Sequence, residues 1–402
     1  MSRLEGYEGY EGYEGYEGYE GYEGYEGYEG YGASRRGGSP SGALIPHRDA
    51  IVGAWAPQGP VRHVPALDPA LDPAVHPTPP NFGVAGLGRL DPRIRRLLFE
   101  SELLSGLHFS SDATSRTATL WHVEVAMAGG APAWSGTPLV SMSLPAPAGL
   151  KAILEAQLDY LNGYADLRGD RAREILAQKA PQHAFWASVL PLQPARHPKT
   201  FELIGMVLRL AKYAEMNFKD ALGVPRPHEL SAQVQPMIPT PIHAALPSGH
   251  ATEAYTVARV LVELATGALP AASAGAKTQL RELLMRQAAR IAINRTVAGV
   301  HYPIDSAAGQ LLGLSLGEYF IARCRPSGGG ATLVDAWALD VAQYPPQGDF
   351  SGQELFDPQA GSRQTTGYAH RIAGAVPGGF ATCAVQGTSR LHWLWQAAAA
   401  EW

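Results

Sequence analysis

The sequence has 402 residues, of which 46% are hydrophobic and 17% are charged, so it can fill one large core or two ordinary ones. Its formal net charge of -5 comes from an N-terminal repeat that holds nine glutamates; beyond residue 31, 31 basic residues face 28 acidic ones. This near-neutral balance excludes a general electrostatic attraction to nucleic acid, and partners must be argued from a local site.

The N-terminal segment, residues 1–42, holds nine Glu-Gly-Tyr triplets from Glu5 to Tyr31 and then a linker of Gly, Ser and Arg. A segment with Gly at every third position and no aliphatic side chain cannot bury a core or hold a helix, so we expect disorder. Residues 43–90 carry prolines at short intervals and predict an extended arm. No signal pattern and no apolar run of about 18 residues is present, which predicts a soluble, cytoplasmic protein without a membrane span.

Helix signals begin at Asp91, where Pro92 occupies a first-turn position ahead of apolar residues. Apolar periodicity predicts further helices at residues 150–161, 171–179, 200–218, 249–266, 277–294 and 303–323. Residues 120–127 fit either a short strand or a buried helical turn, and their pattern does not decide between the two. We therefore predict a mainly α fold with a helical-bundle catalytic domain at 91–325 and its active-site core at 200–323.

A Pro-Ser-Gly-Gly-Gly run after Arg325 marks a boundary. The C-terminal extension, residues 326–402, is expected to pack on the core and to be irregular up to a closing helix near residues 389–402.

The first motif with chemical content runs from Lys219 to Pro227, at the end of a predicted helix. Pro225 and Pro227 restrict the backbone on both sides of Arg226, which aims its guanidinium. Taken alone, a lysine and an arginine of this kind are most often solvated surface charges.

The second motif is Pro247-Ser248-Gly249-His250, at the start of the most apolar predicted helix. Ser248 is suited to the N-cap position, and the free amides behind it, with the positive end of the helix dipole, form an anion site. Gly249 allows the backbone to approach the anion closely, and His250 lies beside it. The alternative is an ordinary serine cap with a polar neighbour.

The third motif places Arg295 at the end of one helix, His301 in the following turn, and Asp305 in the next helix behind Pro303. A carboxylate four residues after a histidine can accept the Nδ1 proton, which frees Nε2 as a nucleophile or ligand. A His and an Asp at this spacing are common, so this motif also decides nothing alone.

Together, three cations, a helix N-terminus with a hydroxyl and two imidazoles describe one pocket for a tetrahedral oxyanion. Their spacing resembles the three-part signature of vanadium haloperoxidases and PAP2-type acid phosphatases. That signature reads Lys, six residues, Arg-Pro; Pro-Ser-Gly-His; and Arg, five residues, His, three residues, Asp. The resemblance covers residues 219–323 and departs from the pattern at Asn294, where the signature usually has Ser.

The resemblance implies a helical-bundle core of that type and a role for each matched residue. His301 would bond the central atom, vanadium or phosphorus, with His250 as acid or base and Asp305 orienting His301. The oxygens would be bound by Lys219, Arg226, Arg295, Ser248 and the Gly249 amide. These roles agree with the chemistry, because charge on the oxygens is best stabilised by fixed donors in a dry pocket.

The family contains two chemistries. With vanadate as cofactor, the enzyme would use hydrogen peroxide to oxidise halide to hypohalous acid; without a cofactor, it would hydrolyse phosphomonoesters through a phosphohistidine at His301. The missing membrane spans, the missing secretion signal and the long extensions favour the haloperoxidase. His243, five residues before Ser248, adds to this because bromoperoxidases of the family hold a His at a similar position, which favours bromide or iodide. His243 could equally be a loop residue bonded to a carbonyl.

A third hypothesis treats the site as vestigial and the Glu-Gly-Tyr repeat as an assembly module, but a complete set of ligands argues against it. The sequence leaves open the halide or organic substrate, the loading of vanadate in the cell, and assembly into a homo-oligomer.

Overall fold

The computed structural model describes residues 83–128, 131–179, 182–270, 273–375 and 377–402. The predicted disordered repeat and nearly all of the Pro-rich arm lie outside these residues. Within them the fold is mainly α, as predicted, and the helices expected from the sequence are confirmed. The helices are α2 (Pro92–Leu104), α3 (Pro147–Ala165), α4 (Arg168–Ala177), α5 (His183–Ala187), α6 (Pro198–Leu222), α7 (Pro227–Leu230), α8 (Gly249–Ala268), α9 (Ala274–Val297), α10 (Pro303–Arg323) and α11 (Ser389–Ala399), with 3-10 helices η4 (Gly83–Arg89) and η5 (Val341–Gln343).

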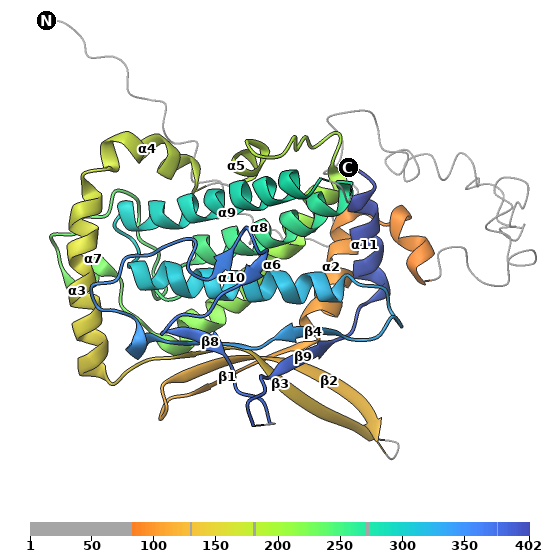
Figure 1. The fold of residues 1–402 in the computed structure, drawn as a ribbon, viewed down its shortest axis with the longest axis horizontal. Coiled ribbons are helices and arrows are strands. Elements are labelled where there is room, and N and C mark those ends of the chain that lie inside the picture. Colours follow the sequence, from red (N-terminus) through yellow and green to blue (C-terminus); the bar gives the residue numbers. More distant parts are fainter. Residues whose placement is uncertain (1–82, 129–130, 180–181, 271–272, 376) are drawn as a thin grey trace, which may run out of the picture. The chain divides into compact units, whose positions relative to one another are not determined.

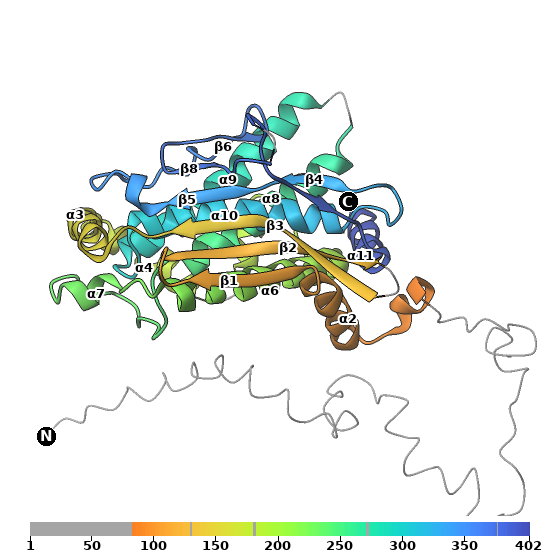
Figure 2. The same cartoon turned by 90° about the horizontal axis from the view of Figure 1, so that it is seen from below.

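A five-stranded sheet lies along one side of the helices (Figures 1 and 2). Its strands, in spatial order, are β1 (Leu107–Asp112), β2 (Thr117–Ala128), β3 (Ala131–Ser143), β5 (Trp337–Asp340) and β8 (Ala369–Arg371). Only β3 and β5 run parallel, with Val140 opposite Trp337. The undecided residues 120–127 therefore belong to a strand, β2, and the expected helical domain at 91–325 also contains three strands.

The C-terminal extension is not irregular, which corrects the expectation from its sequence. Besides β5 and β8, it forms a ladder between β4 (Thr332–Asp335) and β9 (Thr382–Val385) and a short pair between β6 (Phe356–Asp357) and β7 (Ser362–Arg363). These strands are two to four residues long, too short for an alternating pattern to be visible. The closing helix is confirmed as α11.

Helix α10 lies at the centre of the described part of the chain, and all of its residues except Glu318 are buried. A Cβ atom at Gly309 would lie 2.6 Å from the Cβ of Ala251, and one at Gly313 would lie 2.5 Å from the carbonyl oxygen of Thr252. Only glycines at these positions let α10 pack directly on α8. Among the described residues, no helix combines the length and apolarity required to cross a bilayer.

The C-terminal end of the chain caps the start of α6. His197, at the N-cap position, makes no capping bond with its side chain. Instead, the carboxylate of Glu401 accepts hydrogen bonds from the backbone amides of Lys199 at 2.6 Å and Thr200 at 2.8 Å, and from the Thr200 hydroxyl at 2.8 Å. A carboxylate at this place satisfies free amides and complements the helix dipole.

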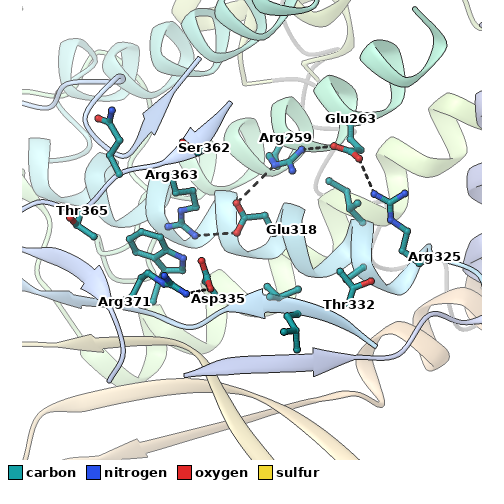
Figure 3. Close-up of a pocket in the computed structure, with 16 residues that line it drawn as sticks. Arg259, Glu263, Glu318, Arg325, Thr332, Asp335, Ser362, Arg363, Thr365 and Arg371 are labelled. Carbon is teal, nitrogen blue, oxygen red and sulfur yellow. Dashed lines mark hydrogen bonds and ion pairs between the residues drawn. The ribbon is translucent and has the colours of Figure 1, made fainter. Parts of the chain in front are cut away.

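Ion pairs of α8, α10 and the C-terminal extension surround a pocket of about 740 Å³ (Figure 3). Each of its four arginines already pairs with a carboxylate: Arg259 and Arg325 with Glu263, Arg363 with Glu318, and Arg371 with Asp335. The Arg363 guanidinium also stacks 3.9 Å from the ring centroid of Trp337. The ion pair between Arg363 and Glu318 therefore holds the extension against α10.

Candidate active site

His301 and Asp305 form a buried pair at the turn between α9 and α10. Nδ1 of His301 lies 2.9 Å from Oδ2 of Asp305, which also accepts the backbone amide of Tyr302 at 3.0 Å. Because Oδ2 already receives a backbone N–H, the arrangement favours a proton on Nδ1 and leaves the lone pair of Nε2 free. Burial raises the pKa of Asp305, whereas the Tyr302 amide, Lys219 and Arg226 lower it.

The imidazole of His301 is neutral in this environment. Burial lowers its pKa well below the usual range, and the nearby charges of Lys219, Arg226 and Arg295 lower it further. A neutral ring with Nδ1 protonated can offer Nε2 to an electrophilic centre.

Lys219 lies in the last turn of α6 and is 1% exposed. Its ammonium donates to the carbonyl oxygens of Ala244, Ala245 and Pro247 at 3.1, 3.0 and 2.5 Å. These three bonds tie the lysine to the loop that leads into Ser248, and so bring its charge to the start of α8. Burial lowers the pKa of Lys219.

Arg226, 2% exposed, is held in one orientation by its neighbours. Its guanidinium donates to the carbonyl oxygens of His243 at 2.8 Å and Val300 at 3.0 Å, next to His301. Its Nη2 also lies 3.1 Å from Nδ1 of His243. Nδ1 of His243 also lies 3.3 Å from the Ala244 carbonyl oxygen, so it accepts from Arg226 when the ring proton is on Nε2 and donates to Ala244 when the proton is on Nδ1. Burial, followed by the charge of Lys219, lowers the pKa of His243 to about 4.

Ser248 occupies the N-cap position of α8, as predicted, but its side chain makes no capping bond. Its amide donates to the Asp305 carbonyl oxygen at 2.9 Å, which joins the start of α8 to the start of α10. Its hydroxyl is buried without a partner. At Gly249, a Cβ atom would lie 2.8 Å from Oε1 of Glu215, so this position has no room for a side chain unless that carboxyl moves.

Gln178, which the sequence did not single out, links Arg295 to His250. Its side-chain oxygen accepts from Nη2 of Arg295 at 2.7 Å, and its backbone oxygen lies 3.0 Å from Nε2 of His250. Nε2 of His250 therefore carries the proton, and Nδ1 is left to accept one. Burial, followed by the charge of Arg295, lowers the pKa of His250 to about 3. Asn294, where the sequence departs from the signature, donates hydrogen bonds to Glu174 and to the side-chain oxygen of Gln178. Because the same Gln178 oxygen accepts from Arg295, Asn294 helps to position Arg295.

All the residues predicted for the pocket converge on the starts of α8 and α10, and His243 joins them through Arg226. Nε and Nη1 of Arg295 and the hydroxyl of Ser248 are buried without hydrogen-bond partners among the described residues. Such groups are rare in folded proteins, and a bound ligand is one of the usual reasons for them. Chemically, the set fits an anion with several acceptor oxygens, and His301 offers a nucleophilic nitrogen to its central atom.

Comparison with known proteins agrees with this description. The family model of the PAP2 superfamily matches residues 203–326. Among solved structures, the chain is similar to a transmembrane PAP2-type phosphatidylglycerolphosphate phosphatase from Bacillus subtilis, with 20% identity and a TM-score of 0.27 over 42% of this chain and 81% of that one. No curated protein matches the chain. The residues predicted for the pocket all lie within residues 203–326, the part of the chain that matches the PAP2 superfamily.

Proposed function

We propose that this protein is an enzyme that binds a tetrahedral oxyanion at His301 and, with vanadate as that anion, oxidises halide with hydrogen peroxide. The observation that carries the proposal is the set of buried donors without partners, Nε and Nη1 of Arg295 and the Ser248 hydroxyl. Each buried polar group without a partner costs about 1–3 kcal/mol. An oxyanion that accepts these hydrogen bonds removes that cost.

The residues of the pocket fit vanadate. Nε2 of His301 would bind the metal, and the oxygens would be held by Arg226, Arg295, Ser248 and the Gly249 amide, with the positive charge of Lys219 beside them. When bound, vanadate supplies a Lewis acid that activates hydrogen peroxide toward attack by halide. Neutral His250 is suited to take up the peroxide proton at Nδ1, because its low pKa leaves that nitrogen unprotonated.

Burial and His243 favour this reaction over ester hydrolysis. The three cations and His301 are each at most 4% exposed, which suits a small resident anion better than an ester with a bulky leaving group. The imidazole of His243 contacts Arg226, one of the residues proposed to bind the anion. We propose that it contributes to halide selection, in favour of bromide or iodide.

Hydrolysis of phosphomonoesters is the second candidate, favoured by the family match and by the free Nε2 of His301. In that reaction Nε2 attacks phosphorus, the bond to the ester oxygen breaks, and the leaving oxygen takes a proton from His250. Water then cleaves the nitrogen–phosphorus bond. This role requires protonated His250, so the bound phosphate must first raise the pKa of His250 from about 3.

One paired assay separates the two candidates. The full chain, with and without vanadate, is tested for bromination with hydrogen peroxide and for hydrolysis of p-nitrophenyl phosphate. We expect bromination only with vanadate, inhibition by excess phosphate, loss in His301→Ala, and no loss in His228→Ala, which removes an exposed histidine. Phosphatase activity that vanadate only inhibits, with no halide oxidised at any pH, would establish the second candidate instead.

A further inference from the structure

A buried carboxylic acid lies against the oxyanion pocket. Glu215 is on α6, one turn before Lys219, and is 2% exposed. Its Oε1 lies 2.8 Å from the place that a Cβ atom of residue 249 would occupy, and its Oε2 is buried without a hydrogen-bond partner. The carboxyl group therefore contacts the start of α8, where the amides that face the anion begin.

The charges around Glu215 do not neutralise it. On α6, the Lys212 ammonium lies 3.8 Å from Oε1, but its side chain is 55% exposed. Lys219, on the same helix, uses its three donors on the carbonyl oxygens of residues 244, 245 and 247. Burial, followed by repulsion from an ionised Glu253 on α8, raises the pKa of Glu215. Burial raises the pKa of Glu253 itself, whereas Lys212, Lys219 and Arg295 lower it.

An ionised Glu215 and a bound oxyanion would repel each other across the start of α8. In a poorly solvated site this repulsion is strong, and buried carboxyls beside a like charge take up a proton instead. We propose that Glu215 couples proton uptake to oxyanion binding: its carboxyl is neutral whenever the pocket holds an anion. This inference rests on the proposed oxyanion site and adds to it a residue that sets the pH range in which the anion binds.

The sign of the pH effect follows from linkage. The neutral acid binds the anion better, so affinity is highest below the pKa of Glu215 and falls as pH rises through it. Lys219 acts in the same direction, because burial lowers its pKa and its positive charge is lost on deprotonation. Removing the titration of Glu215 should therefore reduce the pH dependence by one proton without abolishing it.

The test uses tungstate, a tetrahedral dianion that does not itself titrate near neutral pH, so that the pH dependence reports the protein alone. The dissociation constant of the full chain is measured by calorimetry from about pH 6 to about pH 9 for wild type and Glu215→Gln. Burial raises the pKa of Glu215 to about 8, so above about pH 8 log Kd of wild type is expected to rise by up to about one unit per pH unit more than that of Glu215→Gln, and below it the two slopes should agree. Affinity at the alkaline end should accordingly be about tenfold or more higher in the variant.

Two comparisons make the result decisive. Glu155→Gln, which removes a carboxylate that is 54% exposed on α3, should keep the wild-type profile. Glu215→Gln should also fold, because an amide avoids the desolvation that an ionised carboxylate suffers above its pKa. If wild type binds tungstate but the two pH profiles are parallel, the role of Glu215 is refuted while the pocket stands. If wild type binds no tungstate at any pH, the pocket and the proposed function fail together.

Discussion

Asp305 determines how His301 can act, because its carboxylate orients the ring and selects the tautomer. Oδ2 is bonded to both Nδ1 of His301 and the Tyr302 amide, so one oxygen joins the imidazole to the first turn of α10. Asp305 thus links the fold to the chemistry, because α10 positions its carboxylate and the carboxylate orients the His301 ring so that Nε2 is free.

Asp305→Asn is therefore expected to keep the fold and to weaken oxyanion binding by about 10 to 100-fold, the usual cost of losing a group that orients a ligating histidine. The amide keeps the shape of the side chain but cannot stabilise the imidazole as a carboxylate does. Vanadate affinity and the thermal unfolding midpoint are the two measurements. Equal affinity in the variant and in wild type would show that Asp305 does not support the site.

At the level of single residues, the sequence indicated the residues of the proposed anion site but not the residues that support them. Ser248, Gly249 and His250 are adjacent in the chain, so a short motif reveals them. Gln178 is not revealed in this way, because it meets Arg295 from a position 117 residues away in the sequence. Glu215 did leave a signal: a charged residue one helical turn before Lys219 on the buried face of α6.

Among the elements, α6 has the most unusual support, since its start is capped by Glu401, which lies 202 positions after Lys199 in the chain. Helix α6 carries both Glu215 and Lys219, so the position of its axis matters for the site. The cap from Glu401 also links α6 to the end of the C-terminal extension.

Glu401→Ala is expected to lower the free energy of unfolding by about 1 kcal/mol, the typical value of a helix cap. Glu401→Gln, which keeps one acceptor oxygen, should lose less. Urea unfolding of the three proteins measures the difference. A Glu401→Ala protein as stable as wild type would mean that water satisfies the amides of Lys199 and Thr200 equally well.

Helices were predicted well and the sheet poorly, for a physical reason. A helix closes its hydrogen bonds within four residues, so caps and periodicity in a short window are informative. The strands β3 and β5 pair across almost 200 residues, and β5 is only four residues long. The local sequence of one strand carries no information about the distant strand with which it pairs. Residues 120–127 fit both a strand and a helix from their own pattern, and the pairing of β2 with β1 and β3 shows that they form a strand.

For the described part of the molecule, the C-terminal extension is a component of the core and not an addition to it. It supplies β5 and β8 to the five-stranded sheet, an ion pair to α10, and the cap of α6. The residues of the proposed oxyanion site are earlier in the chain, yet the helices that carry them pack against this later segment.

A chain that ends at Arg325 is therefore expected not to fold cooperatively, although it retains every residue of the pocket. The truncation would expose buried residues of α10, unpair the edge of β3 and remove the cap of α6, a loss comparable to the whole stability of a domain, about 5–15 kcal/mol. Thermal unfolding followed by circular dichroism, with tungstate binding as a second readout, measures this. Deletion of residues 1–40 is the matched control, and it should change neither the transition nor the affinity, because no residue of the pocket lies in that segment. A cooperative transition with intact tungstate binding in the chain that ends at Arg325 would show that residues 91–325 fold independently.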